Sequence, residues 1–393
     1  MKFGQHAAAI LPELVQLRRA IHAAPELGLD LPQTQQRVLQ SLEPDGLDTT
    51  PGSGMSSIVA VLRGAESGPT VLLRADMDAL PLRETTGAGY AFDGEAMHAC
   101  GHDMHVAGLV GAAHLLSAQR DAMKGNVVFM FQPGEEGHNG ASLMLEEGVL
   151  EAGGAIPEAA YGIHVVPNER GVFSTRPGPL MASAAALKVK VHGRGGHASA
   201  PHRTIDPVPV VAELVTALQA FVTRRFDVFD PVVVSVTRLS AGEALNVVPS
   251  SAELGGTIRT MSAGALEQIR REIPPFIEQL AGAHRCRAEV EIAVGYPPTV
   301  NDRELATRAL GVLADTFGNT RARESEAPVM GSEDFSYVLQ RVPGVFIFFG
   351  ASPPDLDSAD IAPLHSPQVL FDDSMLADQA VALAQLAWSH VGS

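Results

Sequence analysis

Three histidines and one cysteine lie within the nine residues of the segment MHACGHDMH at 97–105. Thiolate and imidazole groups suit zinc and neighbouring transition metals, so Cys100 and His102 could bind a metal from one loop. The apolar stretch at 106–116 predicts a helix directly after them. A buried free cysteine with polar groups capping that helix would also explain the segment, so by itself it leaves a structural role open.

Two adjacent carboxylates, Glu135 and Glu136, lie in the Gly-rich stretch FQPGEEG at 131–137, after an apolar segment. Adjacent side chains point in different directions, so one carboxylate could bind metal while the other accepts a proton from water. A solvated acidic turn is the alternative for this pair in isolation. Metal-assisted hydrolysis needs both roles, so the pair favours that chemistry when ligands occur elsewhere in the chain.

Further candidates lie at the ends of apolar segments. His164 lies in YGIHVVP, where a lone histidine is more often a core residue, and His365 lies between two prolines. Asp76 and Asp78 follow the segment TVLL at alternating spacing and could orient metal ligands through hydrogen bonds, although a turn at Pro81 would also explain them. A shared site explains five ligand-type residues on loops better than separate coincidences do: Cys100, His102, one glutamate of the pair, His164 and His365.

The elements that must position these residues follow from apolar periodicity. Short β-rich segments at 57–63, 70–75, 126–131 and 345–349 predict buried strands. Apolar residues at helical spacing predict amphipathic helices over about 8–23 and 374–390, the second beginning at Asp373 and Ser374. Together they predict a layered α/β domain.

The pattern changes between residues 184 and 296, where the sequence predicts strand, helix, strand, strand, helix, strand. This βαββαβ order is that of an α+β ferredoxin-like unit. The α/β domain is therefore expected to be discontinuous, with residues 1–183 and 297–393 on either side of the insertion. Pro- and Gly-rich stretches at 176–180 and 296–298 could serve as hinges.

Composition limits the possible partners and location. The 393 residues carry a net charge of −17, which argues against nucleic-acid and membrane partners. The two cysteines, Cys100 and Cys286, favour a reducing compartment, so we expect a cytoplasmic protein. No targeting segment is evident, and no run of 18 apolar residues occurs that would predict a membrane span.

With these motifs in this order, the chain resembles the M20 metallopeptidase and amidohydrolase family. The resemblance is to its N-acyl-amino-acid amidohydrolase branch, which includes hippurate hydrolases and auxin-conjugate hydrolases. Gly134 and His138 stand where Ala and Gly are expected beside the glutamate pair, and Ala184 stands where a polar residue is common. The resemblance covers nearly the whole chain, through HAAPELGLD (22–30), RADMDALPL (74–82), MHACGHDMH, FQPGEEG, GIHVVP (162–167), GRGGHASAPH (193–202), ALNVVPSSAELGGTIRT (244–260), GSEDFSYV (331–338) and LHSPQVLFDD (364–373).

The resemblance implies that the α/β domain is the catalytic domain. It also implies roles for particular residues of this domain. Two divalent ions per subunit are expected, zinc or manganese first, with cobalt or nickel also acceptable. Glu135 is the expected general base, and Asp78 is expected to support the site. The expected metal ligands are Cys100, His102, Glu136, His164 and His365.

The inserted domain is expected to be a lid that also forms a homodimer or higher homo-oligomer. By resemblance, His197 reaches a neighbouring subunit's site to stabilise the oxyanion, and Asn246 and Arg259 hold the substrate carboxylate. The expected reaction is hydrolysis of small N-acyl-L-amino acids to a carboxylic acid and an amino acid, as by an aminoacylase or hippurate hydrolase. An M20-type dipeptidase or carboxypeptidase is the alternative. A hydrolase with Cys100 as nucleophile and a non-catalytic binding protein on the same fold remain as rivals.

Overall fold

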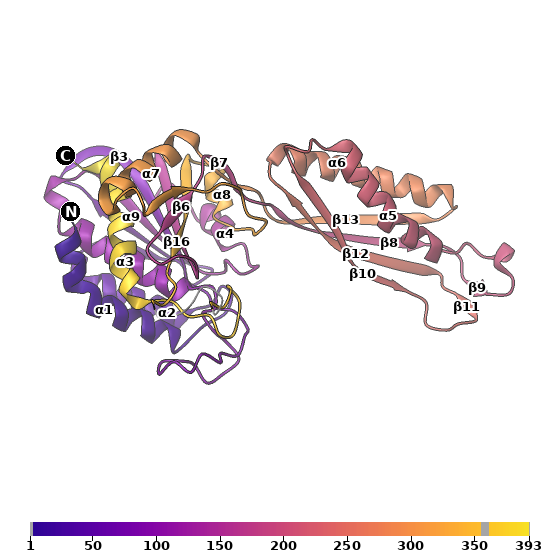
Figure 1. Cartoon of the computed structure of the whole chain (residues 1–393), viewed down its shortest axis with the longest axis horizontal. Helices are drawn as coiled ribbons and strands as arrows, with labels where there is room; N and C mark the ends of the chain where they lie inside the picture. Colours follow the sequence, from indigo (N-terminus) through magenta and orange to yellow (C-terminus); the bar gives the residue numbers. More distant parts are fainter. Residues whose placement is uncertain (1–2, 355–360, 393) are drawn as a thin grey trace. The chain divides into compact units, whose positions relative to one another are not determined.

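The computed structural model describes residues 3–354 and 361–392, which form two compact units (Figure 1). The first unit contains the chain up to Gly178, Val300–Ala327 and the residues from Asp334 onward. The second contains Pro179–Thr299 and also Pro328–Glu333. The predicted insertion at 184–296 falls inside the second unit, but the later return of 328–333 to that unit was not predicted.

An eight-stranded mixed sheet forms the centre of the first unit. Its neighbours β4, β3, β5 and β16 run parallel to one another. Every residue of β5 is buried, as its continuous apolar sequence requires of a strand covered on both faces. The strands in sheet order are β1 (Asp48–Pro51), β2 (Ile58–Arg63), β4 (Lys124–Gln132), β3 (Glu66–Asp76), β5 (Ala159–Val166), β16 (Gly344–Gly350), β6 (Phe173–Thr175) and β15 (Ala322–Glu324).

Helices cover this sheet, and α1, α3 and α9 pack on one another in its main core (Figure 1). The last helical segment begins at Asp373, as predicted, but the capping side chain is that of Asp372, which accepts a hydrogen bond from the Ser374 amide. The helices are α1 (Gly4–His22), α2 (Pro32–Leu42), α3 (His102–Ser117), α4 (Gly140–Glu146), α7 (Arg303–Phe317), α8 (Ser336–Leu339) and α9 (Leu376–Val391), with short 3-10 turns η1 (Glu43–Asp45), η2 (Arg120–Ala122) and η4 (Asp373–Met375).

The second unit has a four-stranded antiparallel sheet in the order β10, β12, β8, β13. The helices α5 and α6 pack on it through a separate apolar core (Figure 1). Its elements along the chain are β8 (Ala184–His192), β9 (Gly196–His197), η3 (Pro201–Arg203), α5 (Val208–Arg225), β10 (Val232–Ala241), β11 (Val247–Val248), β12 (Ser251–Thr260), α6 (Ala263–Ala283) and β13 (Arg287–Tyr296). The chain passes between the units through β7 (Gly178–Met181) and β14 (Thr299–Asn301). Within the described residues, no helix combines the length and apolar character that crossing a membrane requires.

Candidate metal centre

The carboxyl ends of three neighbouring parallel strands bring the candidate residues of the first unit to one edge of the sheet. Strand β3 ends at Asp76, β4 ends at Gln132 just before the glutamate pair, and β5 carries His164 near its end. Carboxyl ends of parallel strands meet at the same edge, which is where open α/β sheets bind ligands. Segments that are far apart in sequence therefore meet at one site.

Cys100 lies at the centre of this site. Its Sγ is 3.4 Å from His164 Nε2 and 3.3 Å from His365 Nε2, and the latter nitrogen is 3.3 Å from Glu136 Oε1. The structure therefore brings all five predicted metal ligands together, with Glu135 beside them. Cys100 belongs to two groups of ligand-type residues whose ligand atoms lie within 4.8 Å of one another, Cys100–His102–His164 and Cys100–Glu136–His365. A further group of this kind is His102–Glu135–Glu136.

The hydrogen bonds of two histidines suit metal binding. His102 donates from Nδ1 to the backbone carbonyl of Asp78 at 2.8 Å, and His164 donates from Nδ1 to the carbonyl of Val165 at 2.7 Å. Each ring therefore keeps its Nε2 lone pair for a cation. His102 Nε2 is buried and makes no hydrogen bond within the described residues. Thiolate, imidazole and carboxylate donors around this nitrogen fit a divalent transition metal.

Asp78 orients the loop that carries the glutamate pair. Its Oδ1 accepts the amide of Glu135, and its Oδ2 accepts the amide of Glu136, each at 3.0 Å. Asp78 and Glu135 are both buried, so these bonds are shielded from water. The carboxylate of Asp78 is thus committed to fixing the backbone from which the two glutamate side chains diverge.

Burial shapes the acid–base behaviour of Cys100. It raises the pKa of the thiol to about 12, since the opposing effect of His102 is smaller. Cys100 is therefore a neutral thiol at neutral pH unless a bound cation displaces its proton. A nucleophilic cysteine needs a lowered pKa, so the environment of Cys100 argues against the cysteine-nucleophile alternative.

His105 lies in the same motif as Cys100 and His102, but its hydrogen bonds give it a structural role rather than that of a metal ligand. Its Nδ1 donates to Asp76 Oδ1 at 2.5 Å, and its Nε2 accepts the amide of Val165 at 2.8 Å. Both nitrogens are therefore used, and neither has a lone pair left for a cation. His105 is three residues after His102, so both rings lie on one face of the helix. This spacing was the feature of the sequence that could have indicated a place for His105 beside the site.

The sequence also did not predict the buried ion pairs that Arg74 forms with Asp76 and Asp334. Arg74 donates to Asp76 Oδ2 at 2.6 Å and to Asp334 Oδ1 at 2.9 Å. Asp334 in turn accepts hydrogen bonds from the Gln132 side chain and the Ala141 amide, so it joins β3, β4 and α4. The motif GSEDFSYV contains Asp334, but nothing in the sequence indicates its partner 260 residues earlier.

The predicted residues of the second unit lie in two separate places. His197 in β9 pairs with Val247 in β11, and the Ala198 amide donates to the Asn246 carbonyl, so His197 and Asn246 are neighbours. Arg259 lies near the other end of β12, paired with Val233. A strand rises about 3.3 Å per residue, so roughly 25 Å separates Arg259 from the loop that carries Asn246. One chain therefore does not bring Asn246 and Arg259 together.

His197 is exposed, and its hydrogen bonds define its tautomer. The backbone amide of Ser199 donates to Nδ1 at 3.2 Å, and the Ser199 hydroxyl lies 2.8 Å from the same nitrogen. Nδ1 must therefore be an acceptor, and the proton of the neutral ring is on Nε2. The ring presents an N–H donor to whatever approaches this end of the unit.

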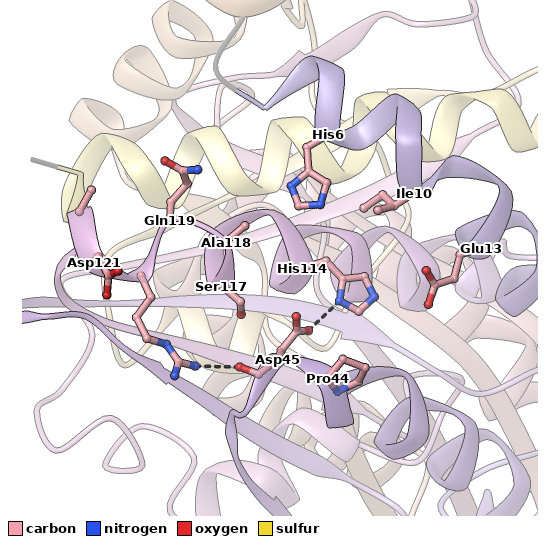
Figure 2. A pocket seen from close by; sticks show the side chains of 12 residues that line it. His6, Ile10, Glu13, Pro44, Asp45, His114, Ser117, Ala118, Gln119 and Asp121 are labelled. Carbon is pink, nitrogen blue, oxygen red and sulfur yellow. Dashed lines mark hydrogen bonds and ion pairs between the residues drawn. The ribbon is translucent and has the colours of Figure 1, made fainter.

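A pocket of about 650 Å³ lies elsewhere on the first unit, between α1, η1, α3 and η2 (Figure 2). Asp45 accepts a hydrogen bond from His114 Nδ1 at 2.7 Å in this pocket, and Arg120 donates to the Asp45 carbonyl. The predicted site residues, all of which the structure describes, are absent from its lining. The pocket is therefore not part of the candidate metal centre.

The chain is similar over most of its length to known proteins of one peptidase family. Residues 72–389 match the model of peptidase family M20/M25/M40. Thermostable carboxypeptidase 2 of Saccharolobus solfataricus is 37% identical, with 95% of this chain and 94% of the relative covered. The IAA-amino acid hydrolase ILR1-like 2 of Arabidopsis thaliana is also 37% identical, covering 96% and 85%. The crystal structure of Bacillus subtilis YXEP protein, a dinuclear metal binding peptidase from the M20 family, matches with a TM-score of 0.81 and 30% identity, covering 97% and 98%.

Proposed function

Since this chain belongs to peptidase family M20/M25/M40, we propose that it is a two-metal amidohydrolase that cleaves N-acyl-L-amino acids to a carboxylic acid and a free amino acid. The cluster around Cys100, which two ligand groups share, is the observation that carries the proposal. A carboxypeptidase and an IAA-amino acid hydrolase are both among its relatives. Substrates of both kinds share an amide bond followed by an amino acid with a free carboxylate.

Two divalent ions, zinc or manganese, would be held by the predicted ligands Cys100, His102, Glu136, His164 and His365. Cobalt and nickel suit the same mixed donor set. When bound, such ions supply the acidification of a water molecule and the polarisation of the scissile carbonyl. Glu136 holds metal, and the adjacent Glu135 is left for proton transfer.

Glu135 accepts the proton of the attacking water and then donates it to the departing amine. The C–N bond breaks as the hydroxyl oxygen is added to the carbonyl carbon, so the acid and the amine leave with the atoms of water divided between them. Asp78 keeps this carboxylate in place, because it binds the Glu135 amide directly. A fixed general base near the reacting water is what this reaction requires.

The substrate pocket in this proposal is shared by two subunits. Asn246 and Arg259 of one chain are too far apart to hold one carboxylate, so Arg259 binds it with the partner subunit's Asn246. The partner subunit's His197 donates from Nε2 to the developing oxyanion, for which the tautomer set by Ser199 is suited. Arg259 offers a planar fork that matches a carboxylate.

The second unit is proposed to be a ferredoxin-like lid through which a homodimer forms, and the first unit is the catalytic domain. The order of its strands in the sheet supports the fold assignment. Strand β10 is at an edge, and apolar side chains on it and in the nearby loops are exposed, among them Val233, Leu239 and Leu245. Exposed apolar strand edges invite pairing with a second copy. We retain the cytoplasm as the proposed location.

A substrate panel tests this function. Zinc- or manganese-loaded enzyme is expected to release amino acid from N-acetyl- or N-benzoyl-amino acids with higher kcat/KM than from dipeptides. The carboxamide of the best substrate should react far more slowly, because Arg259 has no carboxylate to bind. Preference for dipeptides would favour the alternative of a dipeptidase or carboxypeptidase. Equal rates for the acid and its carboxamide would exclude Arg259 as a carboxylate ligand.

A further inference from the structure

A buried cluster of charged residues lies next to the candidate metal centre without being part of it. His22, at the end of α1, has a side chain only 3% exposed, and its neighbour Arg18 is 1% exposed. Both approach Asp103 in the first turn of α3, His22 Nδ1 at 2.8 Å and Arg18 Nε at 2.6 Å from the same carboxylate oxygen. The other ring nitrogen of His22 lies 3.1 Å from Glu84 Oε2 in the loop between β3 and α3.

Both nitrogens of His22 face carboxylates, and carboxylates only accept hydrogen bonds. Nδ1 also lies 3.3 Å from Arg18 Nη2, which is farther than its 2.8 Å distance to Asp103 Oδ2. The ring can satisfy Asp103 and Glu84 together only when both nitrogens carry protons. Burial acts to lower the pKa of His22, but the charge and hydrogen bond of Asp103 and the hydrogen bond of Glu84 outweigh it, so that the pKa is raised. Arg18 opposes this increase, and the rings of Tyr90 and His98 complete the surroundings of His22.

The charges of this cluster balance only with a protonated His22. Asp373 accepts hydrogen bonds from Arg18 and Arg19, at 3.0 and 2.7 Å. Arg18, Arg19 and His22 then provide three positive charges for the three carboxylates of Glu84, Asp103 and Asp373. A neutral His22 leaves one buried carboxylate without compensation, which is costly in a medium of low dielectric constant.

The loop held by His22 contacts the segment that carries His365. Thr86 donates to Glu84, and the backbone amide of Thr85 donates to the carbonyl of Pro367 at 2.8 Å. Pro367 is two residues after His365, whose side chain is 54% exposed and whose φ of 65° is unusual for a residue other than glycine. A ligand in a strained and exposed segment depends on its neighbours for a fixed position.

We propose that doubly protonated His22 is a positioning residue that locks the loop at 84–86 against the segment carrying His365 and so preorganises that ligand for a divalent ion. The inference rests on the metal centre of the proposed function. The clamp is complete below the ordinary imidazole pKa of about 6.5 and is lost as pH rises through the raised pKa of His22. Its contribution to metal affinity should follow the same course.

Zinc affinity measured across pH tests the proposal. Metal-free wild-type protein and His22→Gln are titrated with Zn²⁺ by calorimetry from pH 6 to pH 9, which requires no activity. The variant should bind one zinc more weakly than wild type at pH 6, by at most the roughly 10- to 100-fold loss typical of removing a direct partner of a ligand, because His22 acts through the 84–86 loop. This deficit should shrink at high pH, because wild-type protein then loses its clamp too. A deficit that is constant with pH would indicate a merely structural role and overturn the proposal.

Two further variants make the test specific. His114→Gln is the matched control, since His114 also pairs with a carboxylate on the same unit but lies in the pocket of Figure 2, which contains no predicted ligand. It should leave zinc affinity unchanged at every pH, and a deficit equal to that of His22→Gln would contradict the proposal. Glu84→Gln, which keeps the shape of the side chain, should reproduce the pH-dependent deficit if His22→Gln does not fold.

The protonation state of His22 can be observed directly. In ¹⁵N spectra of metal-free protein at pH 7, both ring nitrogens should carry protons. A bare nitrogen would overturn this inference and leave the proposed function intact. If wild-type protein binds none of zinc, manganese, cobalt and nickel, the proposed function falls and this inference falls with it. Normal zinc binding by His22→Gln at all pH values overturns this inference alone.

Discussion

The proposed mechanism gives two different tasks to the adjacent glutamates Glu135 and Glu136. Glu136 is within reach of Cys100 and His365, whereas Glu135 is assigned proton transfer. Glu135→Gln should therefore retain metal but lose turnover by about 10²–10⁴-fold, the usual range for a general acid–base group. Glu136→Gln should lose metal as well. Metal content by mass spectrometry and kcat separate the two effects, and equal metal loss in both variants would mean that the assignment of the pair is wrong.

Asp78 makes a different prediction, because it acts through the backbone. Asp78→Ala leaves the amides of Glu135 and Glu136 without their acceptor, at a cost of about 1–3 kcal/mol for each buried group. Asp78→Asn keeps one acceptor oxygen and should cost less. Chemical unfolding of the metal-free proteins measures the difference. Similar stability of Asp78→Ala and wild type would show that the loop finds other partners.

At the scale of elements, the loop between β4 and α4 depends on glycine. Gly134 has a φ of +73°, and a Cβ there would lie 2.5 Å from Leu29 Cδ2 and 3.0 Å from His138 Cβ. The Leu29 and His138 side chains thus occupy space that an alanine at 134 would need. Gly137 also has a positive φ, +86°, but open space around it.

This difference provides a matched pair of variants. Gly137→Ala should cost about 1 kcal/mol of unfolding free energy through its backbone alone. Gly134→Ala should cost more, because the methyl group also displaces Leu29, and it should lower kcat by moving the glutamate pair. Thermal unfolding and kinetics of both variants check this. Equal effects would show that Leu29 moves aside freely.

The elements that sequence predicted well are those with a clear local signal. The buried strands and the strand and helix order of the second unit follow from apolar runs and periodicity, and β5 is buried along its whole length as its sequence implies. Contacts between distant segments gave no such signal. Arg74 pairs with Asp334 across 260 residues, and His22 pairs with Asp103 across 81, so their ionic partners could not be read from spacing.

The expectation from resemblance that Asn246 and Arg259 hold one carboxylate did not include which chain supplies each residue. The two residues are thirteen positions apart in the sequence. Strand β12 lies between them and carries the chain away from the Asn246 loop, because an extended strand rises about 3.3 Å per residue. The convergence of the candidate ligands was predictable because their chemical types are distinctive and because the carboxyl ends of parallel strands meet at one edge of the sheet.

At the scale of the whole molecule, the proposed sharing of sites between subunits has a quantitative consequence. His197→Ala should hydrolyse substrate about 10²–10³-fold more slowly than wild type, because it lacks an oxyanion donor. Glu135→Gln should also be nearly inactive. When equal amounts are refolded together, half of the dimers should be mixed. Each mixed dimer has one site with an intact Glu135 facing an intact partner subunit's His197, so about one quarter of all sites should recover. No recovery in mixed dimers confirmed by mass would place His197 outside the neighbouring site.

Dependence on two metal ions is the central claim, and a titration of activity with metal tests it most directly. Protein stripped by a chelator should not hydrolyse an N-acyl amino acid such as N-benzoylglycine. Addition of zinc or manganese should restore release of the amino acid, with activity reaching a plateau at two bound ions per chain. Full activity in protein shown to be free of metal would contradict the account.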